Sequence, residues 1–321
     1  MTCASRLMAP VAVALCAAMA AFSAPAQEYP TRLIRLVVGP GPDTLARLVA
    51  QKLTGSWGQQ VLVDPRPAAA GIIAADTVAK AVPDGYTLLL STTTYTIAAN
   101  LYARLPYDFV RDFAPVSLLA TVPFLLLAHP SLPAKSVGEL IALARARPGE
   151  INYASSGNGA TAHLAGEMLK NMARIDIVHV PYKGIVEGIT NLLGGQVQIM
   201  FASTQTSLPY ARSGRLRALA VSGAKRTPGA PDVPTIAESG FPDYEVSSWN
   251  GVHVPVRTPN AVIARLHAEL LKTLALPDVK ERVSGMGMEP VGNTPDEFAA
   301  VVIADISKWG KAIRESGVRL E

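Results

Sequence analysis

Cysteine, aromatic residues and long apolar segments are all scarce in this chain, and each shortage excludes a class of protein. The two cysteines, Cys3 and Cys16, both lie within the first 26 residues. The rest of the chain therefore has no disulfide, no thiolate chemistry and no cysteine-based metal site. Aromatic residues make up only 6% of the chain, which argues against a site that stacks on sugar rings.

The apolar run Leu7–Phe22 is shorter than the roughly 20 residues that a membrane-spanning helix needs. It follows Arg6 and precedes Ala24–Ala26, which has the A-x-A form of a cleavage site. We therefore predict that residues 1–26 are a secretory signal peptide, cleaved after Ala26. Because no later stretch is longer, we expect an exported, periplasmic protein without a membrane span.

Charge of one sign is also lacking. The chain has 29 Lys and Arg against 25 Asp and Glu, a net charge of +4, and no basic run stands out. Nucleic-acid binding is not indicated. A mild positive balance is compatible with an anionic ligand.

Motifs of common enzymes are missing too. The chain has no G-x-S-x-G, no P-loop and no dinucleotide-binding G-x-G-x-x-G. The histidines show no metal-ligand spacing; they are His129, His163, His179, His253 and His267. We expect no catalytic residue, no metal and no cofactor.

Two similar runs of alternating strands and helices are present, Leu33–Leu90 and Asn152–Phe201. In each run, short apolar strands alternate with amphipathic helices, which predicts parallel strands with right-handed crossovers. The fold class is therefore α/β, with two parallel-sheet lobes joined by a hinge and a cleft between them. One core rarely grows to this chain length, which also favours two lobes.

The chain is expected to cross between the lobes twice, with hinges near Val122–Phe124 and Val221–Lys225. The predicted boundaries are 27–123 with 223–321 for the first lobe, and 124–222 for the second lobe. After the second crossing, Thr294 and Glu297 form a capping box that begins a long helix. The residues expected on its inward face are Phe298, Val302, Ile306, Trp309 and Ile313.

The stretch Ile151–His163 (INYASSGNGATAH) is the candidate binding element. It reads as a strand, a turn of small residues and a helix that begins near Thr161. Such a helix start leaves free backbone N–H groups, and its dipole favours an anion. We therefore expect this turn to hold a carboxylate, although an ordinary capped Gly/Ser turn has the same pattern. His163 could contact the ligand or be a polar residue on an exposed helix start.

Three further loops follow predicted strands, and they are Gly39–Asp43, Ser91–Tyr95 and Pro181–Gly184. In open α/β sheets, ligands bind beyond the carboxyl ends of the strands. Four loops at such ends predict a ligand site between the lobes. Asp43 is also expected to cap the helix that follows it.

Several segments, taken together and in order, resemble the Bug or TctC-like family, the extracytoplasmic solute receptors of tripartite tricarboxylate transporters. The segments are Arg32–Val38, Pro83–Leu88, Asp112–Val116, Asn152–Gly159, His179–Gly184 and Leu193–Val197. The resemblance covers the chain beyond residue 26. It implies a fold similar to type II periplasmic binding proteins, a small carboxylated solute as ligand, and a membrane transporter or sensor as partner. We expect a monomer.

The resemblance also implies a set of ligand-binding residues. In the second lobe they are Ser155, Ser156, Gly157, Gly159, Thr161, His163 and Tyr182; in the first lobe they are Gly39, Gly41, Asp43, Ser91, Thr92 and Thr93. Two first-lobe loops depart from the family pattern. Gly39–Asp43 is about four residues shorter, and Pro65–Ala74 has alanine where the family has glycine. A shorter loop widens the cleft or removes a contact, and alanine hinders close approach of a ligand to the backbone.

Two alternatives remain open at this point. A secreted serine hydrolase of α/β architecture would use Ser155 or Ser156 as its nucleophile. A sensor subunit would bind the same solute but deliver its loaded form to a membrane signalling protein.

Overall fold

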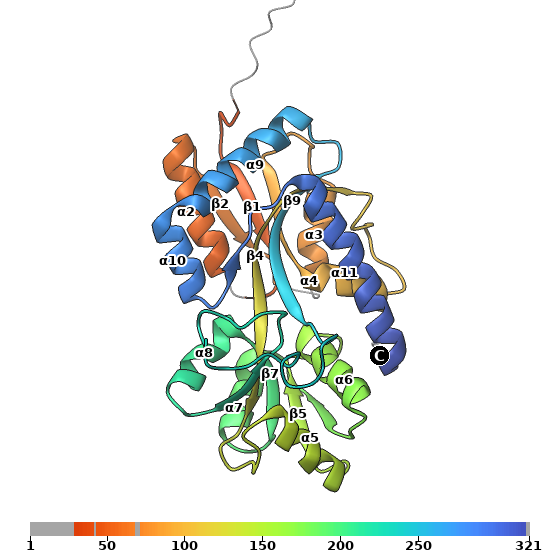
Figure 1. Cartoon of the computed structure of the whole chain (residues 1–321). Helices are drawn as coiled ribbons and strands as arrows, with labels where there is room; N and C mark the ends of the chain where they lie inside the picture. Colours follow the sequence, from red (N-terminus) through yellow and green to blue (C-terminus); the bar gives the residue numbers. More distant parts are fainter. Residues whose placement is uncertain (1–28, 42, 68–70, 319–321) are drawn as a thin grey trace, which may run out of the picture.

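The computed structural model describes residues 29–41, 43–67 and 71–318 (Figure 1). The predicted signal peptide lies outside the described residues. The predicted fold class is confirmed: two α/β lobes lie one above the other in Figure 1 and are linked by long strands. Among the described residues, no helix has the length and apolar character needed to cross a bilayer.

The first lobe is built on a mixed sheet in which the three strands on one side are parallel. Its strands, in spatial order, are β2 (Val61–Pro65), β1 (Ile34–Val38), β3 (Thr87–Thr92), β9 (Ser247–Pro255) and β4 (Phe113–Ala128), with β10 (Glu289–Pro290) paired to β4. β1 pairs in parallel with both β2 and β3, whereas β9 runs antiparallel to β3 and β4. Parallel strands buried on both faces explain the continuous apolar runs in the sequence.

Helices cover both faces of this sheet. One face carries α2 (Thr44–Trp57), α9 (Asn260–Ala275) and α10 (Pro277–Gly285); the other carries α3 (Ile72–Ala79), α4 (Thr93–Leu101) and α11 (Pro295–Ser316). Helix α3 begins after Gly71, whose φ of 85° only glycine adopts easily.

The second lobe repeats the arrangement. Its sheet contains β8 (Arg217–Val221), the second half of β4, β7 (Ile199–Ser203), β5 (Asn152–Ser155) and β6 (Val178–Pro181). β5 pairs in parallel with β6 and β7, as the β-α-β pattern predicts. Two helices pack on each face: α5 (Val137–Ala146) with α6 (Thr161–Ala173), and α7 (Ile185–Leu193) with α8 (Thr204–Arg212).

The strand β4 runs through both sheets. Its 16 residues pair with β9 up to Pro123 and with β7 from Phe124 onward. Ser222 lies beside this point: its N–H donates to the Phe124 carbonyl at 2.8 Å, and its hydroxyl accepts from the Phe124 N–H at 2.9 Å. Val246 in turn donates to the Ser222 carbonyl at 2.8 Å. Three chain segments are therefore hydrogen-bonded side by side where the lobes join.

Residues 223–246 pack mainly on the second lobe. The hydroxyl of Tyr244 donates to the Ala165 carbonyl at 2.9 Å, and the N–H of Ile236 donates to Val221 at 2.9 Å. These contacts favour a lobe boundary near Ser247, whereas the sequence predicts it at residue 223. We therefore propose that the lobe boundary lies near Ser247.

α11 contacts both lobes. The predicted capping box of Thr294 and Glu297 is present at its start. In Figure 1 the helix runs down the side of the first lobe and ends beside α6. There Trp309 and Ile313 share a hydrophobic cluster with Leu164 of α6. The inward residues predicted from periodicity are buried, except that Ile306 is half-buried.

A glycine substitution tests how closely α6 packs on its sheet. A Cβ at Gly166 would overlap the ring of Tyr153, which is fully buried. Overpacking costs about 1–3 kcal/mol, which exceeds the 0.5–1 kcal/mol that alanine gains over glycine in a helix. We therefore expect Gly166→Ala to lower the free energy of unfolding in a urea titration.

Gly55 of α2 is the matched control, because a Cβ there meets no atom within 4 Å. Gly55→Ala should raise stability slightly. If Gly166→Ala were also stabilising, the packing of α6 on Tyr153 would be looser than described.

Candidate functional site

The carboxyl ends of the parallel strands in each lobe face the other lobe. Across this junction, the side-chain amide of Gln205, the second residue of α8, donates to the hydroxyl of Thr44, the first residue of α2, at 2.7 Å. α8 follows β7, and the loop after β1 leads into α2. The loops singled out from the sequence therefore lie at the edge where ligands of open α/β sheets bind.

The second-lobe turn has the predicted form. β5 ends at Ser155 and α6 begins at Thr161. Gly157 and Gly159 have φ values of 133° and 72°, conformations that other residues rarely adopt. The main chain of Tyr182 lies beside the turn, because its N–H donates to the Ser155 carbonyl at 3.1 Å. Six of the seven second-lobe candidate residues thus belong to one strand–turn–helix segment, with Tyr182 next to it.

The start of α6 has no side-chain cap. Its N-cap residue is Ala160, which has no side-chain oxygen to accept from the first-turn N–H groups. The N–H groups of Thr161 and Ala162 therefore have no intrahelical or capping acceptor. Together with the helix dipole they form a site suited to a carboxylate. Ser156 and Thr161 are partly exposed and add hydroxyls nearby.

The Ser155 side chain lies in the protein interior and is hydrogen-bonded there. Its side chain has no exposed surface. Its Oγ accepts from the Gly157 N–H at 3.1 Å and lies 3.0 Å from the Gly157 carbonyl and 2.7 Å from Nε2 of His179. The hydroxyl therefore shapes the turn, and a ligand could reach it only by displacing these partners.

His163 is buried, and the alternative of an exposed helix start is therefore wrong. Only 6% of the residue is exposed, and its Nδ1 accepts from the Gly159 N–H at 3.0 Å. Its ring stacks on His179 with 3.6 Å between centroids. Burial lowers the pKa of His163, and burial together with the neighbouring His163 lowers the pKa of His179 to about 3. Both imidazoles are therefore neutral at neutral pH.

The first-lobe candidates divide into interior and edge residues. The Ser91 hydroxyl donates to the Gly251 carbonyl and lies 2.7 Å from Nδ1 of His253, and Thr93 Oγ1 accepts from the Trp249 N–H. Both side chains are fully buried and hold β9 in place. Thr92 is partly exposed and caps α4 by accepting from the Thr94 N–H at 3.3 Å.

The loop after β1 differs from expectation at its last residue. Asp43 occupies the N-cap position of α2, but its carboxylate makes no capping hydrogen bond. It pairs instead with Arg47, four residues later, at 2.6 Å. The cap prediction is wrong in this respect because a cation one helical turn away competes for the carboxylate.

At the other end of the loop, Gly39 packs on the Tyr95 hydroxyl, so a Cβ there would clash. Gly41, with φ of 120°, is exposed.

The segment 203–206, where β7 ends and α8 begins, was not predicted as part of the site. It reads Ser-Thr-Gln-Thr; Ser203 is the last residue of the apolar strand, and the other three residues begin α8. Gln205 and Thr206 are partly exposed, and Gln205 reaches the first lobe. A polar run at a parallel strand end was the signal that could have identified it.

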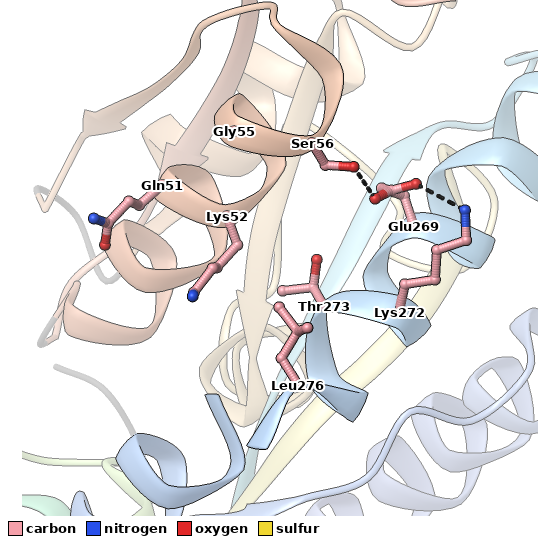
Figure 2. Close-up of a pocket in the computed structure, with 8 residues that line it drawn as sticks. All are labelled: Gln51, Lys52, Gly55, Ser56, Glu269, Lys272, Thr273 and Leu276. Carbon is pink, nitrogen blue, oxygen red and sulfur yellow. Dashed lines mark hydrogen bonds and ion pairs between the residues drawn. The ribbon is translucent and has the colours of Figure 1, made fainter. Parts of the chain in front are cut away.

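A separate cavity of about 460 Å³ lies between α2 and α9 (Figure 2). Glu269 in its wall accepts from the Ser56 hydroxyl and lies 3.4 Å from the Lys272 ammonium. Lys52 pairs with Asp278 at 2.6 Å. Because these charged groups are paired within the protein, the cavity is less suited to bind a carboxylate than the start of α6 is. The described residues contain no group of three or more side chains that could hold a metal ion.

Residues 45–318 match the family model of the tripartite tricarboxylate transporter family receptor, TctC. The chain belongs to this family. It is 36% identical to the protein BugT of Bordetella pertussis, over 99% of both chains. The resemblance noted from the sequence motifs is confirmed.

Two solved structures of R. palustris proteins are similar to this structure over most of the chain. Rpa4515, determined with adipate, has a TM-score of 0.84 at 37% identity and covers 91% of this chain and 99% of its own. MatC, determined with bound malate, has a TM-score of 0.78 at 31% identity and covers 89% of this chain and 100% of its own. The family consists of periplasmic solute-binding receptors.

The missing side-chain cap at the start of α6 leads to a prediction about stability. Ala160 has extended φ and ψ values of −65° and 154°, as an N-cap residue should. Ala160→Asp would cap the helix with a carboxylate, so we expect it to raise the free energy of unfolding by about 0.5–2 kcal/mol. Ala160→Ser, an uncharged cap, should also stabilise the protein. A loss of stability in both variants, measured by urea titration without ligand, would contradict this account of the helix start.

Proposed function

We propose that this protein is a periplasmic receptor that captures a small carboxylated solute between its lobes and delivers it to the membrane subunits of a transporter. The observation that carries the proposal is the uncapped start of α6 at the junction of the lobes. Its free N–H groups match the needs of a carboxylate. The two R. palustris proteins were determined with adipate and with malate, which supports a dicarboxylate here.

The remaining elements of the proposal draw on the family, the sequence and the crossings between the lobes. Receptors of this family work with membrane transporter components, and we propose uptake here in preference to sensing. We also propose export with cleavage after Ala26 and action as a monomer. The lobes would close on the solute by bending near Pro123 and Ser222, where the chain segments cross. Solution scattering should then show a smaller radius of gyration with solute than without it.

Ligand binding can be tested by thermal unfolding of the chain from Gln27 in the presence of adipate, malate or the uncharged adipamide. A ligand at about 100 times its dissociation constant adds about 2.7 kcal/mol of stability. We expect adipate or malate to raise the melting temperature and adipamide to leave it unchanged, because the site recognises the negative charge.

Ala160→Asp is the blocked-site variant for this experiment. Its carboxylate would occupy the N–H groups of α6 and repel the solute, so the shift should disappear although the variant itself is stable. An equal shift in Ala160→Asp would move the binding site elsewhere. A cooperative melt that no carboxylate alters would refute carboxylate binding.

One contact favours the serine hydrolase as a second candidate. Ser155 Oγ lies 2.7 Å from Nε2 of His179, the distance of a nucleophile–base pair. However, the pKa of His179, lowered to about 3, makes it a weak base near neutral pH. Ser155 is fully buried, and among the described residues no carboxylate hydrogen-bonds His179. The contact therefore fits a structural role better than catalysis.

A serine-reactive fluorophosphonate distinguishes the two functions. We expect no labelling of the folded protein, because the Ser155 hydroxyl is buried and already bonded. Mass spectrometry of the treated protein measures the label, with trypsin as the positive control. Labelling at Ser155 that is lost in Ser155→Ala would establish the hydrolase.

A further inference from the structure

Two imidazole rings lie face to face behind the turn that precedes α6. His163 comes from the first turn of α6 and His179 from β6, and their planes are 6° apart with 3.6 Å between centroids. The ring of Tyr153 lies against His179 with 4.9 Å between centroids. The stack is therefore assembled from three elements of the second lobe.

Each imidazole is hydrogen-bonded to one end of the turn. His163 Nδ1 accepts from the Gly159 N–H at 3.0 Å, and His179 Nε2 lies 2.7 Å from the Ser155 hydroxyl. The turn begins at Ser155, and Gly159 is the residue before the N-cap of α6. The stacked pair thus holds both ends of the segment that directs the first N–H groups of α6.

The bond to Gly159 defines the state of His163. A ring nitrogen that accepts from a backbone N–H carries no proton, so the proton of the neutral ring is on Nε2. The neighbouring carboxylate, Glu167, already accepts from the Tyr153 hydroxyl at 2.6 Å and pairs with Lys170 at 3.2 Å. With Nδ1 occupied and the residue 6% exposed, His163 has little surface to offer a solute.

We propose that His163, braced by His179, is a positioning residue that holds the carboxylate-binding turn in its ligand-ready shape and does not touch the solute. A turn held in place before the ligand arrives avoids the cost of ordering it on binding. The affinity part of this inference rests on the proposed function; the hydrogen bond to Gly159 does not.

Three substitutions at His163 separate positioning from direct contact. His163→Phe keeps a flat ring on His179 but removes the acceptor. His163→Asn loses the ring but places an oxygen close to where Nδ1 stands. His163→Gln places its polar group nearer the position of Nε2, the atom through which a direct contact would act.

Affinities for adipate and malate are measured by calorimetry on variants that melt cooperatively. Because the Phe variant leaves a buried N–H unsatisfied, we expect it to bind roughly tenfold more weakly than the wild type. His163→Asn should bind more tightly than both Phe and Gln. Wild-type affinity in the Phe variant, or tighter binding by Gln than by Asn, would overturn the proposal.

A ligand-free measurement keeps the inference separate from the proposed function. Amide hydrogen exchange of Gly159, followed by NMR, should be faster in His163→Phe and close to wild type in His163→Asn. The Gly188 amide, which bonds to the Gly184 carbonyl, is the internal control. Unchanged Gly159 exchange in the Phe variant would overturn the positioning role. If neither acid bound the wild type, the proposed function would fail while the exchange data still decided this inference.

Discussion

The N–H groups at the start of α6 are the constraint on which the rest of the site depends. The first N–H groups of a helix need acceptors, and the side chain of Ala160 supplies none. The parallel pairing of β5 with β6 and β7 carries this start to the edge that faces the first lobe. Only proline removes a backbone N–H, so other substitutions around the start of α6 leave these donors in place.

Four polar side chains of the candidate site are engaged within the protein. Ser91 and Thr93 are bonded to β9, and Ser155 and His163 are bonded to the turn that precedes α6. A buried hydroxyl or imidazole without a partner would cost about 1–3 kcal/mol, which explains why each has one. In the proposed site, the exposed hydroxyls and the free N–H groups would remain for the solute. A polar motif in the sequence therefore does not show which of its side chains are already engaged within the protein.

The sequence predicted the alternating strands and helices of Leu33–Leu90 and Asn152–Phe201, the start of α6 at Thr161 and the inward face of α11, because these follow from local periodicity and capping. It did not predict α4 or α8. It did not predict the stack of His163 on His179, since the rings belong to a helix and a strand that meet only in the folded lobe. The pairing of Asp43 with Arg47 was missed for another reason. A cap and an i, i+4 ion pair compete for one carboxylate, and the pattern alone does not rank them.

The helix α11 connects the lobe junction to the binding element. Its buried Asp305 accepts from the Thr96 hydroxyl of α4 at 2.6 Å and from the Trp249 indole of β9 at 2.9 Å, and burial raises the pKa of this carboxyl. One turn later, Trp309 packs in the cluster that includes Leu164 of α6. The helix that would bind the solute is therefore packed against a helix anchored in the other lobe. Any bending at the crossings must repack this contact, so the proposed solute capture and lobe closure would involve the same helix.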